Sequence, residues 1–446
     1  MLWIIAIVYI LAALLLTVRI MGAGHTPAAA AAWLLAVWLM LPAGALLYML
    51  TAWYSAGEVP RRTDGGESFV ESVVSGGCGA EASDGNSVEL LNDGCEMFPS
   101  LIRELHRARR TIHLEYYIFN DDRIGKAIAD VLLRKVRAGV EVRLLYDAVG
   151  SWRLSQSLVR YLRENGVEVA AFGRVRFPWF TPTANIRNHR KVAVIDGRTA
   201  FIGGINIARK YLDGDELGRW RDEHLRIEGP AVADLQRLFA KDWSHAGGRP
   251  FDAASTIAAT TSQAGLRMQI GWSQTGTTRR TLADAFTAAI MHAQSEIRIS
   301  TPYFVPSDSL LRAMCIAAAG GVRVRLMVPA RADLRSASLA GESYFGELLA
   351  AGAEIYLYDK GFLHSKTMSV DSSMASVGTA NLDCRSLFTN WEVAAFVYDR
   401  DFASMAAATF ERDLQHCRRL DRREYEARTL GRRMSARFWR LFSPLL

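Results

Sequence analysis

The sequence has few cysteines, and none of them stands in a CxxC pair. Five are scattered through 446 residues, which is an odd and widely spaced set. Such a set supports neither a disulfide framework nor a zinc site, and it fits a reducing, cytosol-facing location. The positions are Cys78, Cys95, Cys315, Cys384 and Cys417.

Net charge is also nearly absent outside the C-terminal end. The formal net charge is +7, and nine arginines against three acidic residues between 418 and 440 account for most of it. The near-neutral body argues against a surface that coats nucleic acid. The basic tail instead indicates one local anionic partner, such as a membrane surface rich in anionic headgroups.

Charged side chains are almost missing from two stretches near the N-terminus. Leu2 to Val18 is apolar nearly throughout and ends at Arg19, and Ala28 to Trp53 is a second apolar run. Each is long enough, or nearly so, to cross a hydrocarbon core of about 30 Å. No basic segment precedes the first run, as a signal peptide would require. We therefore expect residues 1–54 to form two transmembrane or membrane-embedded helices.

The distribution of basic residues indicates which side of the membrane carries the rest of the chain. Arg61, Arg62 and the basic tail outweigh the lone Arg19 near the loop between the two runs. The positive-inside rule then predicts a multi-pass membrane protein whose large remaining part lies on the cytoplasmic side. A helix pair that only dips into one leaflet would give the same sidedness.

The remainder of the chain alternates strands and helices in two similar series, which indicates α/β architecture. The segments AGVEVRLLYD and GGVRVRLMVP are direct counterparts, and a period this long means a duplicated domain. We expect two α/β halves, each a mixed sheet flanked by helices. The predicted boundaries are a linker at 55–87, a first half at 88–250, a connector at 251–266, a second half at 267–417 and a basic amphipathic tail at 418–446.

A motif of the form H-x-K-x4-D-x9-N occurs twice, with a constant lag of 175 residues. Two such motifs in register, in two similarly patterned halves, predict that the halves face one active site. The candidate residues are His189, Lys191, Asp196 and Asn206 in the first copy, and His364, Lys366, Asp371 and Asn381 in the second.

Alternation along a strand places the histidine and the lysine of each motif on the same side. Asp196-Gly197 is a signal for a type I′ hairpin turn, and Asp371-Ser372-Ser373 is suited to turn the second hairpin. Asp196 and Asp371 are therefore candidates for catalysis and equally for support of the hairpins. Asn206 and Asn381 are predicted to bind substrate phosphate.

The chemistry of this set suits a phosphodiester. Two lysines and two asparagines offer cationic or neutral polar groups to anionic oxygens. No acidic cluster accompanies them, so neither a metal ion nor another cofactor is required. Two imidazoles divide the work, because one attacks phosphorus and becomes a phosphohistidine while the other protonates the leaving alkoxide and later deprotonates the acceptor.

These motifs resemble those of the phospholipase D superfamily. The apolar N-terminus and the segments NHRKVAVIDGRTAFIGGIN, STPYFVP and GFLHSKTMSVD look like those of its bacterial cardiolipin synthase branch. The resemblance implies two phospholipase D-like halves in an enzyme of the bacterial inner membrane. It also implies transfer of a phosphatidyl group between two phosphatidylglycerol molecules, with release of glycerol.

Family members further imply a role for each histidine. The N-terminal histidine is usually the nucleophile, which would be His189, with His364 as acid and base. A carboxylate on a later strand holds each imidazole and steadies its charged form. Asp222 and Glu392 match that pattern, and Glu223 and Asp383 are rival candidates.

Five functions remain open at this point. Phosphatidylglycerol as acceptor makes the protein a cardiolipin synthase, whereas water makes it a phospholipase D hydrolase and phosphatidylethanolamine or another alcohol makes it a different phosphatidyltransferase. A nuclease of the same superfamily and a membrane scaffold without activity are the others. The expected partners are phospholipid substrates and an anionic membrane surface, without nucleic acid, and the sequence leaves the oligomeric state open.

Overall fold

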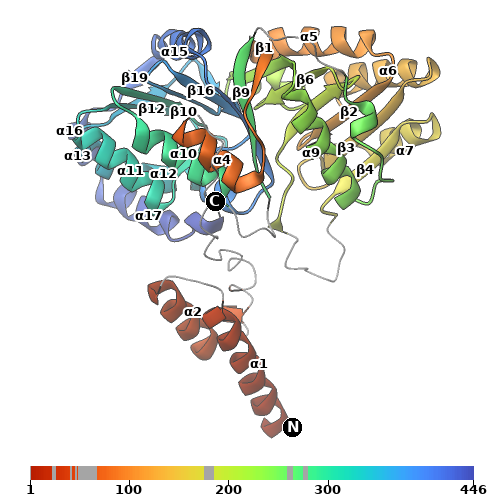
Figure 1. The fold of residues 1–446 in the computed structure, drawn as a ribbon. Coiled ribbons are helices and arrows are strands. Elements are labelled where there is room, and N and C mark those ends of the chain that lie inside the picture. Colours follow the sequence, from red (N-terminus) through yellow and green to blue (C-terminus); the bar gives the residue numbers. More distant parts are fainter. Residues whose placement is uncertain are drawn as a thin grey trace.

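The computed structural model of the chain separates into N-terminal helices and a larger body (Figure 1). The structure describes residues 2–22, 27–40, 43–45, 48, 68–174, 185–258, 265–274 and 280–445.

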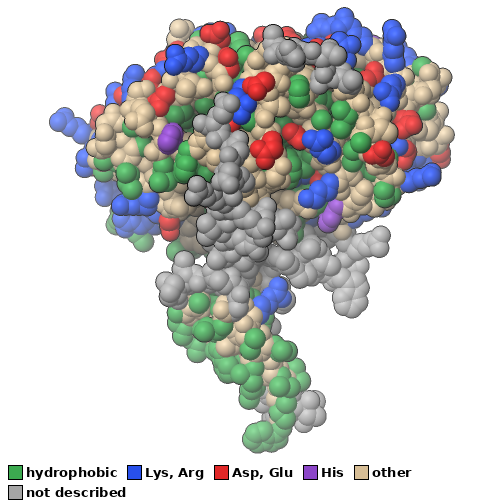
Figure 2. All heavy atoms as spheres, in the orientation of Figure 1, with side chains coloured by type: hydrophobic (Ala, Val, Ile, Leu, Met, Phe, Trp, Pro, Cys, Tyr) green, Lys and Arg blue, Asp and Glu red, His purple; other side chains and the backbone are tan. Residues whose placement is uncertain are grey.

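The N-terminus forms helices α1 (Leu2–Gly22) and α2 (Pro27–Leu39). They pack on each other through a small apolar cluster that includes Ala13, Ile20 and Val37. Apolar side chains cover most of the visible surface of this part, whereas acidic and basic side chains are interspersed over the body (Figure 2). Within the described residues, no helix combines the length and the hydropathy of a membrane span. The two predicted spans therefore stay a prediction.

The body is built on one continuous sheet of fifteen strands. Strands β1 (Ser83–Asn92) and β9 (Leu266–Ser273) pair antiparallel at its centre and join the two halves. Counted from β1 or β9 outwards, seven strands stand in the same order in each direction, and β19 adds an outer strand to the second half, so an approximate two-fold axis relates the halves. The order is β19-β13-β12-β10-β15-β16-β18-β9-β1-β8-β6-β5-β2-β3-β4.

The first half alternates strands and helices as the sequence predicts. Its remaining elements are α5 (Asp93–Arg107), β2 (Thr111–Tyr116), α6 (Arg123–Arg137), β3 (Glu141–Asp147), α7 (Gln156–Glu164), β4 (Glu168–Phe172), β5 (Lys191–Ile195), β6 (Thr199–Gly203), α8 (Lys210–Asp213), β7 (Arg219–Arg221), β8 (Glu223–Glu228) and α9 (Val232–His245).

The second half follows after a connector that contains the short helix η2 (Ala254–Thr256). Its elements after β9 are α10 (Thr281–His292), β10 (Glu296–Ser300), β11 (Phe304–Val305), α11 (Asp308–Ala319), β12 (Arg323–Pro329), α12 (Arg335–Glu342), α13 (Phe345–Ala351), β13 (Glu354–Tyr358), β14 (Gly361–Leu363), β15 (Thr367–Val370), β16 (Met374–Gly378), β17 (Leu382–Asp383), α14 (Cys384–Phe388), β18 (Glu392–Val397) and α15 (Arg400–Leu414). The chain ends with β19 (Cys417–Arg419), α16 (Arg422–Glu426), α17 (Leu430–Arg440) and η3 (Ser443–Leu445).

Three apolar layers hold the body together. One layer packs helices of the first half on its sheet, and a second does the same in the second half. The third layer lies beneath α9 and α15. It joins β-branched and small side chains from both halves of the sheet, including Val194, Ile202, Val377 and Val393. Because this shared layer is buried by both halves, burial of apolar area favours their association.

Residues 55–67 of the predicted linker at 55–87 lie outside the described residues, and the rest of that range is folded. Helix α4 (Phe69–Cys78) and the start of β1 lie inside that range. Val70 and Val74 of α4 belong to the core of the second half. A Cβ at Gly77 would lie 2.6 Å from the Thr281 hydroxyl, so the small residues that suggested a linker instead permit close packing of α4 on α10.

The predicted tail at 418–446 also differs from the structure at its start. Strand β19 is the outer strand of the sheet and pairs antiparallel with β13, so the boundary at 418 cuts through an element of the second half. Helix α17 packs on α12. It is basic and amphipathic as predicted, because its exposed apolar residues share one face with arginines beside them.

Candidate active site

The two motif histidines meet where the halves join, and each is anchored to the opposite half. The backbone N–H of His189 donates to the carbonyl of Trp391 at 2.9 Å, and that of His364 donates to the carbonyl of Arg221 at 2.7 Å. Strands β7 and β14 pair in parallel, with Leu363 opposite Arg221. An equivalent parallel bridge joins Asn188 and Trp391.

This parallel pairing determines which carboxylate contacts which histidine. The residue after each paired position is a histidine on one strand and an acid on the other. His189 Nδ1 lies 2.9 Å from Glu392 Oε1, and His364 Nδ1 lies 2.6 Å from Asp222 Oδ2. The two hydrogen bonds therefore cross between the halves, and each half supplies the carboxylate for the histidine of the other.

The two histidine–carboxylate pairs differ at one motif position. A Cβ on Gly204 would lie 2.0 Å from Asp222 Oδ1, so only glycine leaves room for that carboxylate. The equivalent residue in the second half is Thr379, whose hydroxyl donates a hydrogen bond to Glu392. Glu392 thus has one side-chain donor that Asp222 lacks.

Burial and these contacts set the protonation of the pairs. Burial lowers the pKa of His189 to about 4 although Glu392 opposes the shift. Burial disfavours ionisation of Glu392, but His189, Lys191 and Thr379 outweigh it and lower its pKa. A neutral His189 that donates Nδ1–H to a charged Glu392 leaves the Nε2 lone pair free.

The second pair holds a proton more readily. Burial raises the pKa of Asp222 to about 7, against the attraction of Lys366. Burial and the neighbouring Lys366 lower the pKa of His364. The His364–Asp222 pair, titrating as one unit, therefore carries an additional proton up to about neutral pH, which the His189–Glu392 pair does not.

The motif lysines are buried beside the histidines. Lys191 Nζ donates to the carbonyl of His189, and Lys366 Nζ lies 2.9 Å from His364 Nδ1. Burial lowers the pKa of both amines, that of Lys366 to about 8. At neutral pH the charge on Lys366 is retained in a site that excludes most water.

Both histidines and both motif asparagines line one cavity of about 400 Å³. Asn206 accepts from the N–H of Ile118 at 2.9 Å and donates to the Tyr211 hydroxyl at 2.6 Å, while Asn381 donates to Asp383 at 3.0 Å. Aromatic and charged side chains complete the wall. The lining consists of Tyr117, Ile118, His189, Asn206, Lys210, Tyr211, Trp220, Tyr303, Asp333, Leu334, Ala337, His364, Asn381, Asp383, Arg385, Ser386 and Asn390.

A family model described as "Cardiolipin synthase, PLD-like domain" matches residues 101–243 and 286–414. The chain belongs to this family. It is 43% identical over 361 residues to cardiolipin synthase 2 of Bacillus anthracis, covering 80% of this chain and 70% of that protein. It is also 42% identical over 364 residues to the cardiolipin synthase of Geobacillus kaustophilus (strain HTA426), covering 80% and 72%.

Two solved structures with low sequence identity to this chain share its fold. Phosphatidylserine synthase from Haemophilus influenzae Rd KW20 superposes with a TM-score of 0.61 at 17% identity, covering 80% of this chain and 92% of that one. Polyphosphate kinase from Porphyromonas gingivalis gives 0.53 at 12% identity, covering 82% and 52%. The duplicated α/β architecture is therefore that of the phospholipase D-like fold.

The structure does not bring the motif aspartates to the cavity. Asp196 and Asp371 lie at the far ends of β5 and β15. Asp196 accepts from the backbone N–H groups of residues 109–111, and Asp371 from those of residues 294–296. Both have positive φ, 54° and 52°, as a type I′ turn requires. Neither aspartate lines the cavity, and both accept hydrogen bonds that support the hairpins, which is the second role that the sequence allowed.

The rival carboxylates contact other groups. Glu223 pairs with Arg221 at 2.6 Å, and Asp383 accepts from the N–H of Ser386 at the start of α14. Sequence reasoning missed Lys210, whose ammonium lies 3.7 Å from the centre of the Trp220 ring. The one sequence feature that could have indicated Lys210 is its position four residues after Asn206. In the described residues, no three His, Cys, Asp or Glu side chains form a metal-ligand group.

Proposed function

We propose that this protein is a cardiolipin synthase that transfers a phosphatidyl group from one phosphatidylglycerol to a second and releases glycerol. The family match is to cardiolipin synthases over most of the chain. The observation that carries the proposal is the pair of buried histidines in one cavity, each held by a carboxylate of the opposite half.

In the first step, Nε2 of His189 attacks the phosphorus of the donor lipid. The P–N bond forms as the bond from phosphorus to the oxygen of the headgroup glycerol breaks. His364 gives its Nε2 proton to that oxygen. Glu392 steadies the positive charge that develops on the His189 ring. The products are a phosphatidyl-histidine and free glycerol.

In the second step, His364 accepts the proton of the terminal hydroxyl of a second phosphatidylglycerol. The hydroxyl oxygen attacks phosphorus, the P–N bond breaks, and His189 returns to its neutral form. Lys191, Lys366, Asn206 and Asn381 would donate to the non-bridging oxygens, whose charge is greatest in the transition state.

We assign the roles of the two histidines from the difference in protonation between the two histidine–carboxylate pairs. The nucleophile must be neutral at the start, and the acid must hold a proton. Glu392 accepts a hydrogen bond from the Thr379 hydroxyl and has a lowered pKa, whereas burial raises the pKa of Asp222 to about 7. These differences favour His189 as the nucleophile and His364 with Asp222 as the acid.

We also propose that the enzyme is a multi-pass protein of the bacterial inner membrane, with its catalytic body on the cytoplasmic side. The apolar N-terminal helices support this location. A further support is the exposed apolar stripe of α17, whose members are each more than half exposed: Leu430, Met434, Phe438 and Leu441. Arg433 and Arg437 beside the stripe suit an anionic bilayer surface.

Trapping the intermediate tests the mechanism. A phosphatidyl donor with a good leaving group needs no acid, so His364→Ala should accumulate a phosphatidyl adduct that mass spectrometry locates on His189. His189→Ala should form none. An adduct on His364 in His189→Ala would reverse the proposed order.

Product analysis tests the acceptor. Labelled phosphatidylglycerol should yield cardiolipin and glycerol in equal amounts. Phosphatidic acid without cardiolipin would identify a hydrolase, and a labelled product with phosphatidylethanolamine would identify a different transferase.

A further inference from the structure

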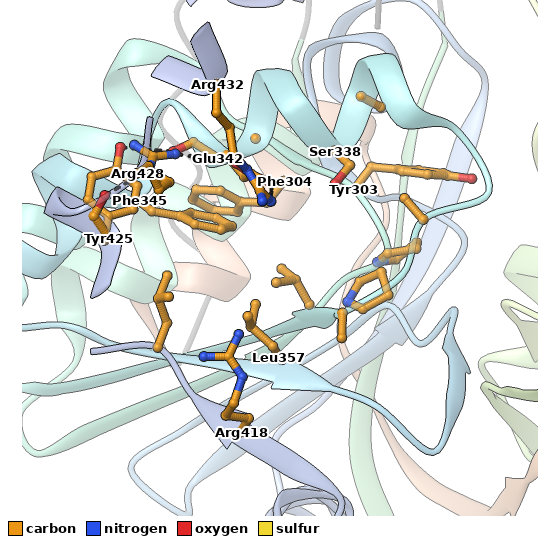
Figure 3. Close-up of a pocket in the computed structure, with 18 of the residues that line it drawn as sticks. Tyr303, Phe304, Ser338, Glu342, Phe345, Leu357, Arg418, Tyr425, Arg428 and Arg432 are labelled. Carbon is orange, nitrogen blue, oxygen red and sulfur yellow. Dashed lines mark hydrogen bonds and ion pairs between the residues drawn. The ribbon is translucent and has the colours of Figure 1, made fainter. Parts of the chain in front are cut away.

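A second cavity, of about 190 Å³, lies in the second half beside the catalytic cavity. Helix α12, the ends of β12 and β13, and the C-terminal elements surround it. One part of its wall is apolar, and Figure 3 shows Phe304, Phe345 and Leu357 there, while polar and charged side chains line the rest. The apolar part suits a hydrocarbon chain, and the polar part suits a headgroup.

The rim of this cavity is cationic. Arg418, Arg428 and Arg432 line it together with two acids, Glu342 and Glu424 (Figure 3). Arg432 pairs with Glu342 at 2.6 Å, and Arg418 pairs with Glu424 at 2.5 Å. The side chains of Arg418 and Arg432 are both 57% exposed. They therefore retain donors for an anion at the rim, and arginine binds phosphate through two parallel hydrogen bonds.

The two cavities share a wall. Tyr303 and Ala337 line both of them. The Tyr303 hydroxyl is held by Asp333, at 2.6 and 2.7 Å from its two carboxylate oxygens. Tyr303 and Ala337 therefore separate the two cavities.

We propose that the second cavity binds the acceptor phosphatidylglycerol, with its phosphate on the rim arginines and a segment of one acyl chain inside. This inference rests on the proposed function. The donor lipid is on His189 when the acceptor attacks, so the acceptor needs its own anion site. Its reacting hydroxyl is at the end of the glycerol headgroup, several bonds from its phosphate, and the headgroup would pass over Tyr303 and Ala337 to reach His364.

Blocking the cavity tests the site. Ser338 lines it, and Ser336 of the same helix is outside the lining of both cavities. The full-length protein in detergent micelles would be irradiated with phosphatidylglycerol that carries a diazirine on one acyl chain. Peptides containing Phe345 or Leu357 should be labelled in the natural protein and in Ser336→Leu. We expect labelling of these peptides to fall about tenfold in Ser338→Leu, equivalent to roughly 1.4 kcal/mol.

Removing a rim charge tests the anion contact. Arg432 is an exposed arginine of α17, and Arg312 of α11 is an exposed arginine outside the lining of both cavities. Arg432→Gln should raise the KM for acceptor phosphatidylglycerol about tenfold, because a charge-assisted hydrogen bond contributes about that factor. The rate of glycerol release from the donor should stay unchanged, so the ratio of cardiolipin to phosphatidic acid should fall. Arg312→Gln should leave that ratio unchanged.

The outcomes separate this inference from the proposed function. Cardiolipin formation without labelling of the cavity peptides would overturn the inference and leave the proposed function intact. Equal labelling by a diazirine phosphatidylcholine would also overturn it, because that lipid is zwitterionic. Specific labelling without cardiolipin formation would support an anionic lipid site and overturn the proposed function together with the acceptor role.

Discussion

Replacing Glu392 by glutamine removes the charge that faces the nucleophile while nearly preserving shape. Glu392 is fully buried, and both its carboxylate oxygens lie within 3.0 Å of His189 Nδ1. His189 becomes cationic as the P–N bond forms, and in Glu392→Gln that charge would face a neutral amide. Breaking one side of a buried charge pair costs about 3–5 kcal/mol, so kcat should fall roughly 10³-fold.

Initial rates of cardiolipin formation from phosphatidylglycerol micelles would measure the effect, with kcat and KM determined separately. Glu392→Asp keeps the charge at a greater distance and should recover part of kcat. Thr379→Val, which removes one donor to Glu392, should cost about tenfold. Thermal unfolding would show that each variant is folded. A loss in kcat of less than tenfold for Glu392→Gln, or a change in KM alone, would refute the reasoning.

Other predictions follow from the same contacts. Asp371→Asn should destabilise the protein by about 1–2 kcal/mol through weakened backbone hydrogen bonds, with kcat per folded molecule retained; a large loss of kcat in folded protein would contradict the hairpin role. These hydrogen bonds lower the pKa of Asp371 against the effect of burial, so its stabilisation should be complete above the unfolded value of about 3.9 and be lost as pH falls below it, measured by urea unfolding across pH. Glycerol release should slow as pH rises through about 7, where the His364–Asp222 pair loses its additional proton. This fall in rate near pH 7 should be absent in Asp222→Asn. A second decline should follow above about pH 8, where Lys366 loses its charge; a rate that rises through this range would contradict both assignments.

The sequence predicts the repeated parts of this fold well, because each depends on local pattern. The counterpart segments AGVEVRLLYD and GGVRVRLMVP contain the strands β3 and β12. The hairpin after Asp196 was predictable because a type I′ turn favours Asp-Gly. The segment at 68–78 was not, because its serines and glycines look alike whether they form a linker or a tightly packed helix.

The candidate site also has features that the sequence predicts and features that it does not. The motif spacing predicts that His189 and His364 share a cavity, and the acids Asp222 and Glu392 were proposed by resemblance. The crossing of these pairs was not predictable, since the partners stand 203 and 142 residues apart and are brought together by the parallel bridges between halves. The position of Asp196 away from the cavity depends equally on where backbone N–H groups of another strand lie.

The crossing of the two pairs also bears on how such a chain could arise. Two identical single-motif subunits related by a two-fold axis would exchange carboxylates in the same manner, and each would be inactive alone. In such a homodimer both histidines are equivalent by symmetry and must share the roles of nucleophile and acid. Gene fusion removes that constraint, because the two copies then mutate independently. Gly204 in one half and Thr379 in the other are the kind of asymmetric substitution through which fusion allows the two histidines to specialise.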